Sequence, residues 1–138
     1  MIEKQTNIYF FRLANVQPGD LVCDPMCGGG SIPIEGAISY KQGFYFAGDM
    51  HEKAMERTRD NLKTFDSKIP SDGIQWDVTN IPLRDNCLDV LITDLVSLNT
   101  SKFSILLISK KTSNFEAVYW GISSSGVFHL LFLRSLYF

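Results

Sequence analysis

The stretch Val22-Cys23-Asp24-Pro25-Met26-Cys27-Gly28-Gly29-Gly30-Ser31-Ile32-Pro33-Ile34-Glu35 decides the fold of this chain. A short apolar segment ends in an acid, passes through a glycine-rich turn and continues into a helical pattern. This order is typical of the first ligand-binding loop at the carboxyl edge of a parallel α/β sheet. Asp24 stands at the mouth of the loop, so its charge bears on which ligand the loop accepts.

The segments around this loop alternate between strand-like and helix-like patterns. We expect helices at 6–15, 32–42 and 52–63, and strands at 21–24, 44–48, 74–76 and 88–93. Ser31 is the expected N-cap of the second helix. The alternation predicts an α/β protein with a Rossmann-like, doubly wound and mostly parallel sheet.

The composition changes near residue 95. Of the 15 acidic residues, 14 lie in 1–95 and only Glu116 lies beyond. Residues 96–138 show no regular alternation of elements, although 103–109 has the apolar pattern of a strand. We therefore expect 1–95 to form the ligand-binding half of a domain whose sheet is incomplete after the fourth strand. Residues 96–138 are expected to be an atypical tail.

Length and charge restrict the function classes. A chain of 138 residues suffices for one domain, and a net charge of −2 gives no bulk signature of nucleic-acid binding. The three cysteines lack the spacing of a zinc or redox motif, so no metal site is expected. No secretory signal and no run of about 18 apolar residues is present. These features predict a cytoplasmic protein that does not engage a membrane.

Each predicted strand runs into an acid: Asp24, Asp49, Asp77 and Asp94. Ligands of open α/β sheets bind beyond the carboxyl ends of the strands. A single acid at such a place is usually a turn residue or a helix cap. Four acids in phase, one of them within a glycine loop, instead favour a binding site.

The first loop discriminates between cofactors. Gly28 and Gly30 allow close approach of a ligand, but Pro33 occupies the place of the third glycine of a dinucleotide fingerprint. The carboxylate of Asp24 would repel a pyrophosphate and attract an ammonium group. Asp49, 25 residues later, is placed to accept hydrogen bonds from ribose hydroxyls.

Asp77 would accept from an adenine amine, with Val78 as an apolar contact. These features favour S-adenosylmethionine over the alternative, NAD in an oxidoreductase. The complete predicted cofactor set is Asp24, Pro25, Cys27, Gly28, Gly30, Ser31, Asp49, Met50, Asp77 and Val78.

Four segments carry a family resemblance: LANVQPGD (13–20), DPMCGGGSIPIEGA (24–37), FAGD (46–49) and IQWDVTNIPLRDNCLDVLITDL (74–95). They resemble the catalytic domain of the THUMP-domain-containing tRNA guanine-N2-methyltransferases. The resemblance implies a class I methyltransferase fold and methyl transfer to the exocyclic amine of a guanosine in tRNA. It also implies a preceding THUMP domain that captures RNA, and a small zinc-binding activator subunit as partner.

The resemblance implies catalytic roles for Asp94 and Leu95. The carboxylate and the adjacent main-chain carbonyl would accept the hydrogens of the guanine amine, whose lone pair is delocalised and therefore poorly nucleophilic. The family continues Asp-Leu-Pro-Phe-Gly, whereas this chain continues Asp94-Leu95-Val96-Ser97-Leu98. The proline and the aromatic residue that would stack on a flipped-out base are therefore replaced.

The departure after Leu95 has a specific candidate origin. A eukaryotic intron commonly begins GTAAGT or GTGAGT, and either hexamer read in phase encodes Val-Ser, the residues at 96 and 97. We hypothesise that 96–138 is translated from a retained intron or another alternative 3′ sequence, with divergence of an ordinary exon as the alternative. The genomic sequence around codon 95 distinguishes the two. A non-catalytic fragment that binds the cofactor or the activator is the alternative to an active enzyme.

Overall fold

The computed structural model describes residues 2–64, 70–96, 103–109, 116–122 and 128–134. Within these ranges the elements follow the order α1 (Ile2–Leu13), β1 (Leu21–Asp24), α2 (Ser31–Ser39), β2 (Phe44–Asp49), α3 (Glu52–Thr64), β3 (Ser71–Gln75), β4 (Val90–Val96), β5 (Phe103–Ser109), β6 (Glu116–Ile122) and β7 (Phe128–Arg134). Side chains are described for 8–64 and 70–94.

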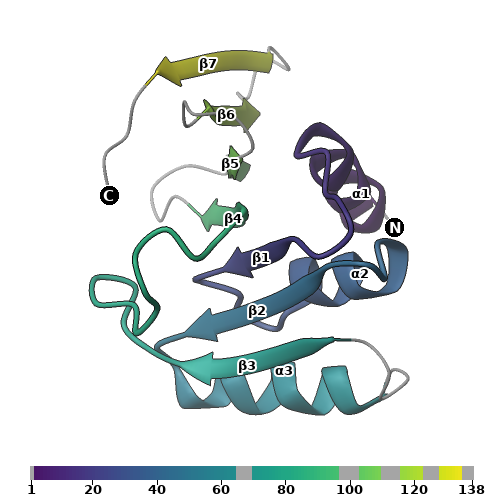
Figure 1. Ribbon diagram of the computed structural model, residues 1–138, viewed down its shortest axis with the longest axis vertical. Coiled ribbons are helices and arrows are strands. Elements are labelled where there is room, and N and C mark those ends of the chain that lie inside the picture. Colours follow the sequence, from purple (N-terminus) through teal and green to yellow (C-terminus); the bar gives the residue numbers. More distant parts are fainter. Residues whose placement is uncertain (1, 65–69, 97–102, 110–115, 123–127, 135–138) are drawn as a thin grey trace.

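The first four strands form the parallel part of one sheet, in the order β3-β2-β1-β4 (Figure 1). The predicted parallel α/β architecture is therefore confirmed, and the carboxyl ends of these four strands meet at one edge. The strand order reverses direction between β1 and β4, because β2 and β3 lie on one side of β1 and β4 lies on the other. Such a switch point is where open α/β sheets bind their ligands.

Beyond β4 the sheet continues as three antiparallel strands, β5, β6 and β7. The strand predicted at 103–109 is confirmed, whereas the expectation of no regular structure is wrong for the segments of β6 and β7. The connections in this part are five or six residues long. A parallel connection needs a dozen or more residues, so these lengths allow only antiparallel pairing.

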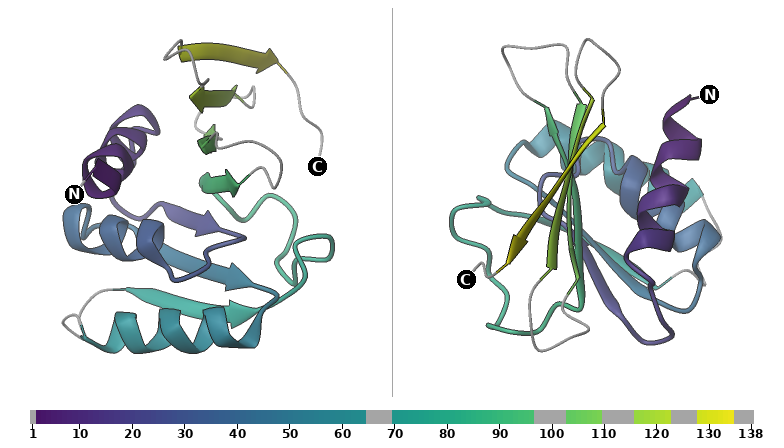
Figure 2. Two further views of the ribbon diagram at one scale, coloured as in Figure 1. Left: turned by 180° about the vertical axis from the view of Figure 1, so that it is seen from behind. Right: turned by 90° about the horizontal axis from the view of Figure 1, so that it is seen from above.

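The three helices pack against one face of the sheet (Figure 2). The connections β1–α2–β2 and β2–α3–β3 step in the same direction across the sheet, and right-handed crossovers therefore place both helices on the same face. Phe11 of α1 contacts the ring of Tyr45, a residue of β2, in an edge-on arrangement. The connection from β3 to β4 contains no helix in the part of the chain described here.

The core lies between these helices and the sheet. Its buried cluster contains Phe10, Phe11, Ala14, Val22, Ile32, Ala37, Tyr45, Val90 and Ile92. Burying one large apolar side chain contributes about 2 kcal/mol to stability. Among the described side chains, this cluster therefore makes the main stabilising contribution. The core therefore fixes the strand ends from which the site is built.

Some boundaries differ from the sequence prediction. The N-cap of α2 is Gly30 rather than Ser31, because Gly30 adopts a left-handed conformation with φ 80° and Ser31 is already helical. β4 ends at Val96 rather than at Thr93, because β5 pairs with it as far as Val96 opposite Phe103.

Candidate functional site

The four predicted acids lie at or near the carboxyl edge of the parallel strands. Asp24 and Asp49 are the last residues of β1 and β2, and Asp77 follows the end of β3 by two residues. Asp94 lies in β4, two residues before its end. The predicted positions at the strand ends are confirmed for the first two acids, while Asp94 lies within the ladder with β5 instead.

The glycine loop between β1 and α2 has the backbone conformation that its sequence requires. Gly28 and Gly30 have φ values of 52° and 80°, a region that side-chain-bearing residues rarely adopt. A Cβ at Gly28 would meet nothing within 4 Å, so open space lies beside the loop at this residue. The loop therefore leaves room beside its backbone at Gly28, whereas the space beside Gly30 is filled by the side chain of Thr58.

The loop is joined to the end of β2 by Asp49. One carboxylate oxygen of Asp49 accepts the Gly28 amide at 2.9 Å, and the other accepts the His51 amide at 2.9 Å. The Cys27 amide also donates to the carbonyl of Gly48, at 2.8 Å. Because each carboxylate oxygen has a second lone pair, Asp49 keeps the capacity to accept hydroxyl groups of a ligand.

Helix α3 holds the other side of the loop, a role that the sequence did not reveal. The Thr58 hydroxyl donates to the Gly28 carbonyl and the Asn61 amide donates to the Gly29 carbonyl, each at 3.0 Å. A Cβ on Gly30 would lie 2.8 Å from the methyl carbon of Thr58, so only glycine fits there. In the sequence these two residues sit within a charged helix, and no pattern separates them from its solvated face.

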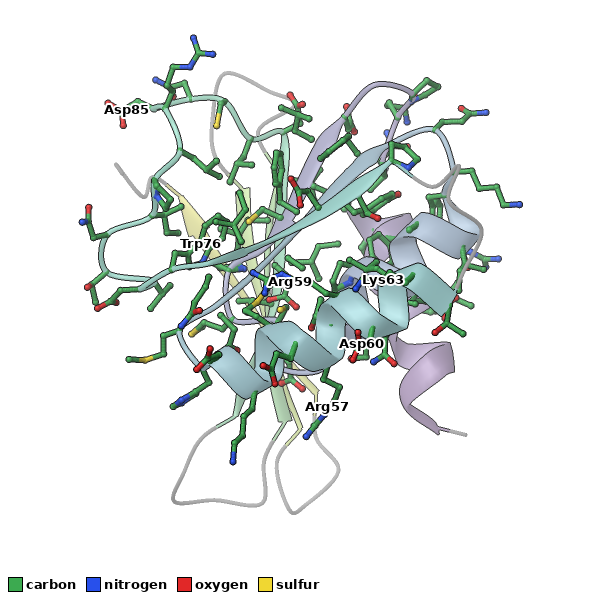
Figure 3. All side chains as sticks on the ribbon, turned by 90° about the horizontal axis from the view of Figure 1, so that it is seen from below. Arg57, Arg59, Asp60, Lys63, Trp76 and Asp85 are labelled. Atoms are coloured by element: carbon green, nitrogen blue, oxygen red, sulfur yellow. The ribbon has the colours of Figure 1, made fainter. Side chains whose placement is uncertain are left out.

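Most charged residues of α3 are exposed to solvent. Figure 3 shows Arg57, Asp60 and Lys63 along this helix. Lys63 lies 3.8 Å from Asp60, and both side chains are largely exposed. An exposed pair of this kind contributes little to stability.

Asp24 is a buried carboxyl group with only 3% of its surface exposed. Its pKa is raised to about 7, chiefly by burial and to a smaller extent by the nearby charges of Asp94 and Asp49. The nearby Thr93 side chain and the hydrogen bond that the Met26 amide donates to Asp24 at 3.2 Å act in the opposite direction and lower this pKa. The carboxyl group therefore changes its charge near neutral pH, and a cation placed beside it would favour the ionised form.

Asp77 is exposed and closes a turn. One of its carboxylate oxygens accepts both the amide and the hydroxyl of Thr79, each at 2.8 Å, and these bonds lower its pKa. Val78 and Met50 follow the ends of β3 and β2 and are 40% and 59% exposed. Two exposed apolar side chains at this edge can contact an aromatic ring such as adenine.

Asp94 and Leu95 pair with Ile105 and Ser104 of β5. The negative charge of Asp94 is close enough to Asp24 to raise its pKa. The structure thus brings Asp94 into the same electrostatic cluster as Asp24 and Asp49. The side chain of Leu95 lies outside the described residues, and only its backbone pairing is known.

Neither a metal site nor a membrane-spanning helix is found in the described residues. No three of their His, Cys, Asp or Glu side chains are grouped closely enough to hold a metal ion. None of their helices has the length and apolar character needed to cross a bilayer.

The parallel strands, the glycine loop and the acids at the switch point define a Rossmann-like class I methyltransferase fold. Solved structures agree. Coclaurine N-methyltransferase bound to N-methylheliamine and SAH superposes with a TM-score of 0.57 at 14% identity, covering 65% of this chain and 34% of that chain. A putative S-adenosyl-L-methionine-dependent methyltransferase from Methanococcus maripaludis gives a TM-score of 0.55 at 21% identity, covering 65% and 40%. At these identities the likeness concerns the fold alone.

The sequence places the chain more narrowly. It belongs to the family described as RMKL-like, methyltransferase domain, whose pattern matches residues 7–96. The tRNA (guanine(6)-N(2))-methyltransferase THUMP3 of Bos taurus is 40% identical over 95 residues, and that of Homo sapiens is 39% identical. The U6 snRNA (guanine-N(2))-methyltransferase THUMPD2 of Mus musculus is 35% identical over 83 residues.

These matches cover about three fifths of this chain, 61% for THUMP3 and 60% for THUMPD2. They cover only 19% and 16% of the relatives' own length. The family match ends at residue 96 and includes every predicted site residue. The resemblance to guanine-N2-methyltransferases that the sequence motifs indicated is thereby confirmed.

Proposed function

We propose that this chain forms the S-adenosylmethionine-binding half of a methyltransferase that acts on the N2 amine of guanosine in tRNA. The observation that carries the proposal is the set of carboxyl groups gathered around a left-handed glycine loop. Asp24 and Asp49 end adjacent parallel strands, and Asp94 contributes to the same electrostatic cluster. Membership of a methyltransferase family over 7–96 supports this assignment over an NAD-dependent oxidoreductase.

The residues present fit S-adenosylmethionine. Asp24 would hold the ammonium group, since its buried carboxyl gains most from a nearby cation. The loop residues Pro25, Cys27, Gly28, Gly30 and Ser31 would contact the methionine portion, where the open space at Gly28 admits a ligand. Asp49 would accept the ribose hydroxyls.

The adenine would lie at the ends of β2 and β3. Met50 and Val78 offer exposed apolar surface there, and Asp77 offers a carboxylate to the exocyclic amine. Because the ring is flat and largely apolar, contact on its faces and one hydrogen bond at its edge suffice to orient it.

When bound, S-adenosylmethionine supplies an electrophilic methyl group on its sulfonium. Asp94 and the Leu95 carbonyl would accept the two hydrogens of the guanine amine and hold its nitrogen in line with that methyl group. The amine loses one proton as it gains the methyl group, and the carboxylate of Asp94 would receive that proton. The protein's contribution is therefore orientation together with proton acceptance.

The partners follow from the same family. We propose tRNA as the substrate, captured by a THUMP domain, with a small zinc-binding activator subunit bound to the methyltransferase domain. The corresponding compartment is the cytoplasm. Acidic and basic residues are interspersed along α3, so this helix by itself is no basic surface of the kind that binds RNA.

A second function is favoured by one observation. The strand end at Asp94-Leu95 does not open into a loop here, because β4 continues to Val96 and pairs with β5. A chain that retains the cofactor residues but lacks the family's substrate motif would bind S-adenosylmethionine or the activator without transferring a methyl group.

Titration calorimetry and a transfer assay test these functions in turn. The chain should bind S-adenosylmethionine and S-adenosylhomocysteine but not NAD, and binding of NAD alone would overturn the proposal. Transfer of a radiolabelled methyl group to tRNA, with the activator subunit present, separates the enzyme from the non-catalytic fragment. Asp94→Asn should abolish transfer while leaving cofactor affinity within about threefold.

A further inference from the structure

Trp76 connects three segments of the proposed cofactor site. It follows the last residue of β3, and its indole N–H donates to the Pro25 carbonyl in the first loop at 3.0 Å. Its backbone amide donates to the carbonyl of Asp49 at 3.1 Å. Only 6% of the side chain is exposed, so the indole hydrogen bond is shielded from water. Figure 3 shows the residue where the chain leaves β3.

The indole ring lies against Gly48 on the face of the sheet opposite the helices. Ala47 packs with Met55 of α3, and successive side chains of a strand point to opposite faces, so position 48 faces away from α3. A Cβ on Gly48 would lie 1.9 to 2.2 Å from atoms of the indole ring. Glycine at 48 therefore makes the space in which the ring reaches from β3, across β2, to the loop after β1.

The segments joined in this way are those that the cofactor would span. Pro25 follows Asp24, Gly48 precedes Asp49, and Trp76 itself precedes Asp77. Resting on the proposed function, we propose that Trp76 is a positioning residue that holds these three segments at the spacing one S-adenosylmethionine molecule requires. The sequence alone predicts only a place in the sheet core for Trp76, a role that concerns stability.

The two roles predict different behaviour. A ligand that contacts three loops at once binds tightly only if their spacing is fixed before it arrives. Removing the indole N–H leaves the Pro25 carbonyl without its partner and frees the first loop relative to β3. If Trp76 served only as a core residue, its replacement would lower the stability of the chain but would leave the ligand affinity of the folded molecules unchanged.

The test compares Trp76→Phe with Val90→Ala by calorimetry against S-adenosylhomocysteine. Val90 is a buried core residue of β4, 1% exposed, and belongs to neither the loop nor the acids, so its truncation lowers stability alone. Both variants are measured well below their melting temperatures. Trp76→Phe should weaken binding about five- to tenfold, as expected for one shielded hydrogen bond, and Val90→Ala by less than twofold. Equal affinities of the two variants would overturn the role of Trp76.

Failure of the wild-type chain to bind S-adenosylhomocysteine would overturn the proposed function itself, so the two failures are distinguishable. If Trp76→Phe does not fold, NMR of the wild-type chain decides, with Trp120→Phe used to assign the two indole signals. Hydrogen exchange at the Trp76 indole should slow at least threefold on saturation with S-adenosylhomocysteine, because the ligand clamps the loop against it. An unchanged exchange rate would overturn the inference.

Discussion

Replacing Asp24 by asparagine should stabilise the chain, and more so as the pH rises. Asp24 is buried, and burial is the largest cause of the rise of its pKa from 3.8 to about 7. Asparagine has nearly the same shape, carries no charge and keeps an oxygen for the Met26 amide. The substitution therefore removes the cost of ionising a buried carboxyl group while preserving its packing.

The sign and size follow from the two pKa values. The folded chain holds the Asp24 proton more tightly than the unfolded chain, so stability falls as the pH rises from about 4 through 7 and levels off above it. With these values the loss is about 2 kcal/mol at pH 5 and about 4 kcal/mol at pH 8. The stability advantage of Asp24→Asn over the wild type should therefore grow by about 2 to 3 kcal/mol between pH 5 and pH 8.

Urea unfolding followed by circular dichroism at pH 5, 6, 7 and 8 measures this difference without ligand. Asp77→Asn is the matched control, because Asp77 is fully exposed and its pKa is lowered, so it stays ionised across this range. Its stability difference from the wild type should be constant with pH. An Asp24→Asn advantage that is constant, or that shrinks as the pH rises, would refute the reasoning about burial.

Three further predictions concern the loop and its ligand. Gly30→Ala should destabilise the chain by about 1 to 3 kcal/mol in urea unfolding, because φ is 80° and the added Cβ would lie 2.8 Å from Thr58; an unaffected midpoint would contradict this geometry. Thr58→Val should weaken S-adenosylhomocysteine binding about threefold or more in calorimetry by freeing the Gly28 carbonyl, whereas Thr58→Ser should bind as the wild type does. The affinity of the wild type for S-adenosylhomocysteine should rise about fivefold from pH 6 to pH 7 as Asp24 ionises, and this rise should be absent in Asp24→Asn.

The parallel half of the fold could be predicted from local patterns. The loop at 24–31, the strands around it and the helices between them each carry their own signal in short stretches of sequence. Because parallel strands need crossover helices, this alternation left few topologies open. The antiparallel strands β6 and β7 were not predicted, since strand pairing there depends on partners distant in sequence and on short connections rather than on a distinctive local pattern.

The acids and glycines of the candidate site could be picked out from the sequence, whereas the residues that support its loop could not. Asp24, Asp49, Gly28 and Gly30 were identified because acids that end parallel strands beside a glycine-rich loop are typical of a ligand-binding edge. Thr58 and Asn61 were missed because helix residues that bond to a loop 30 residues away look like any polar residue of a solvated helix.

The sequence by itself determined the family, the class of fold and the places of Asp24 and Asp49 at the ends of parallel strands. Those properties are encoded locally, in the glycine loop, in the acids that follow the strands and in the motifs of 13–95. Tertiary structure alone decided the pKa of Asp24, the contact of Trp76 with Pro25 and Gly48, and the continuation of β4 past Asp94 into a ladder with β5. Burial, shielding and strand pairing depend on groups that the chain brings together only when it folds.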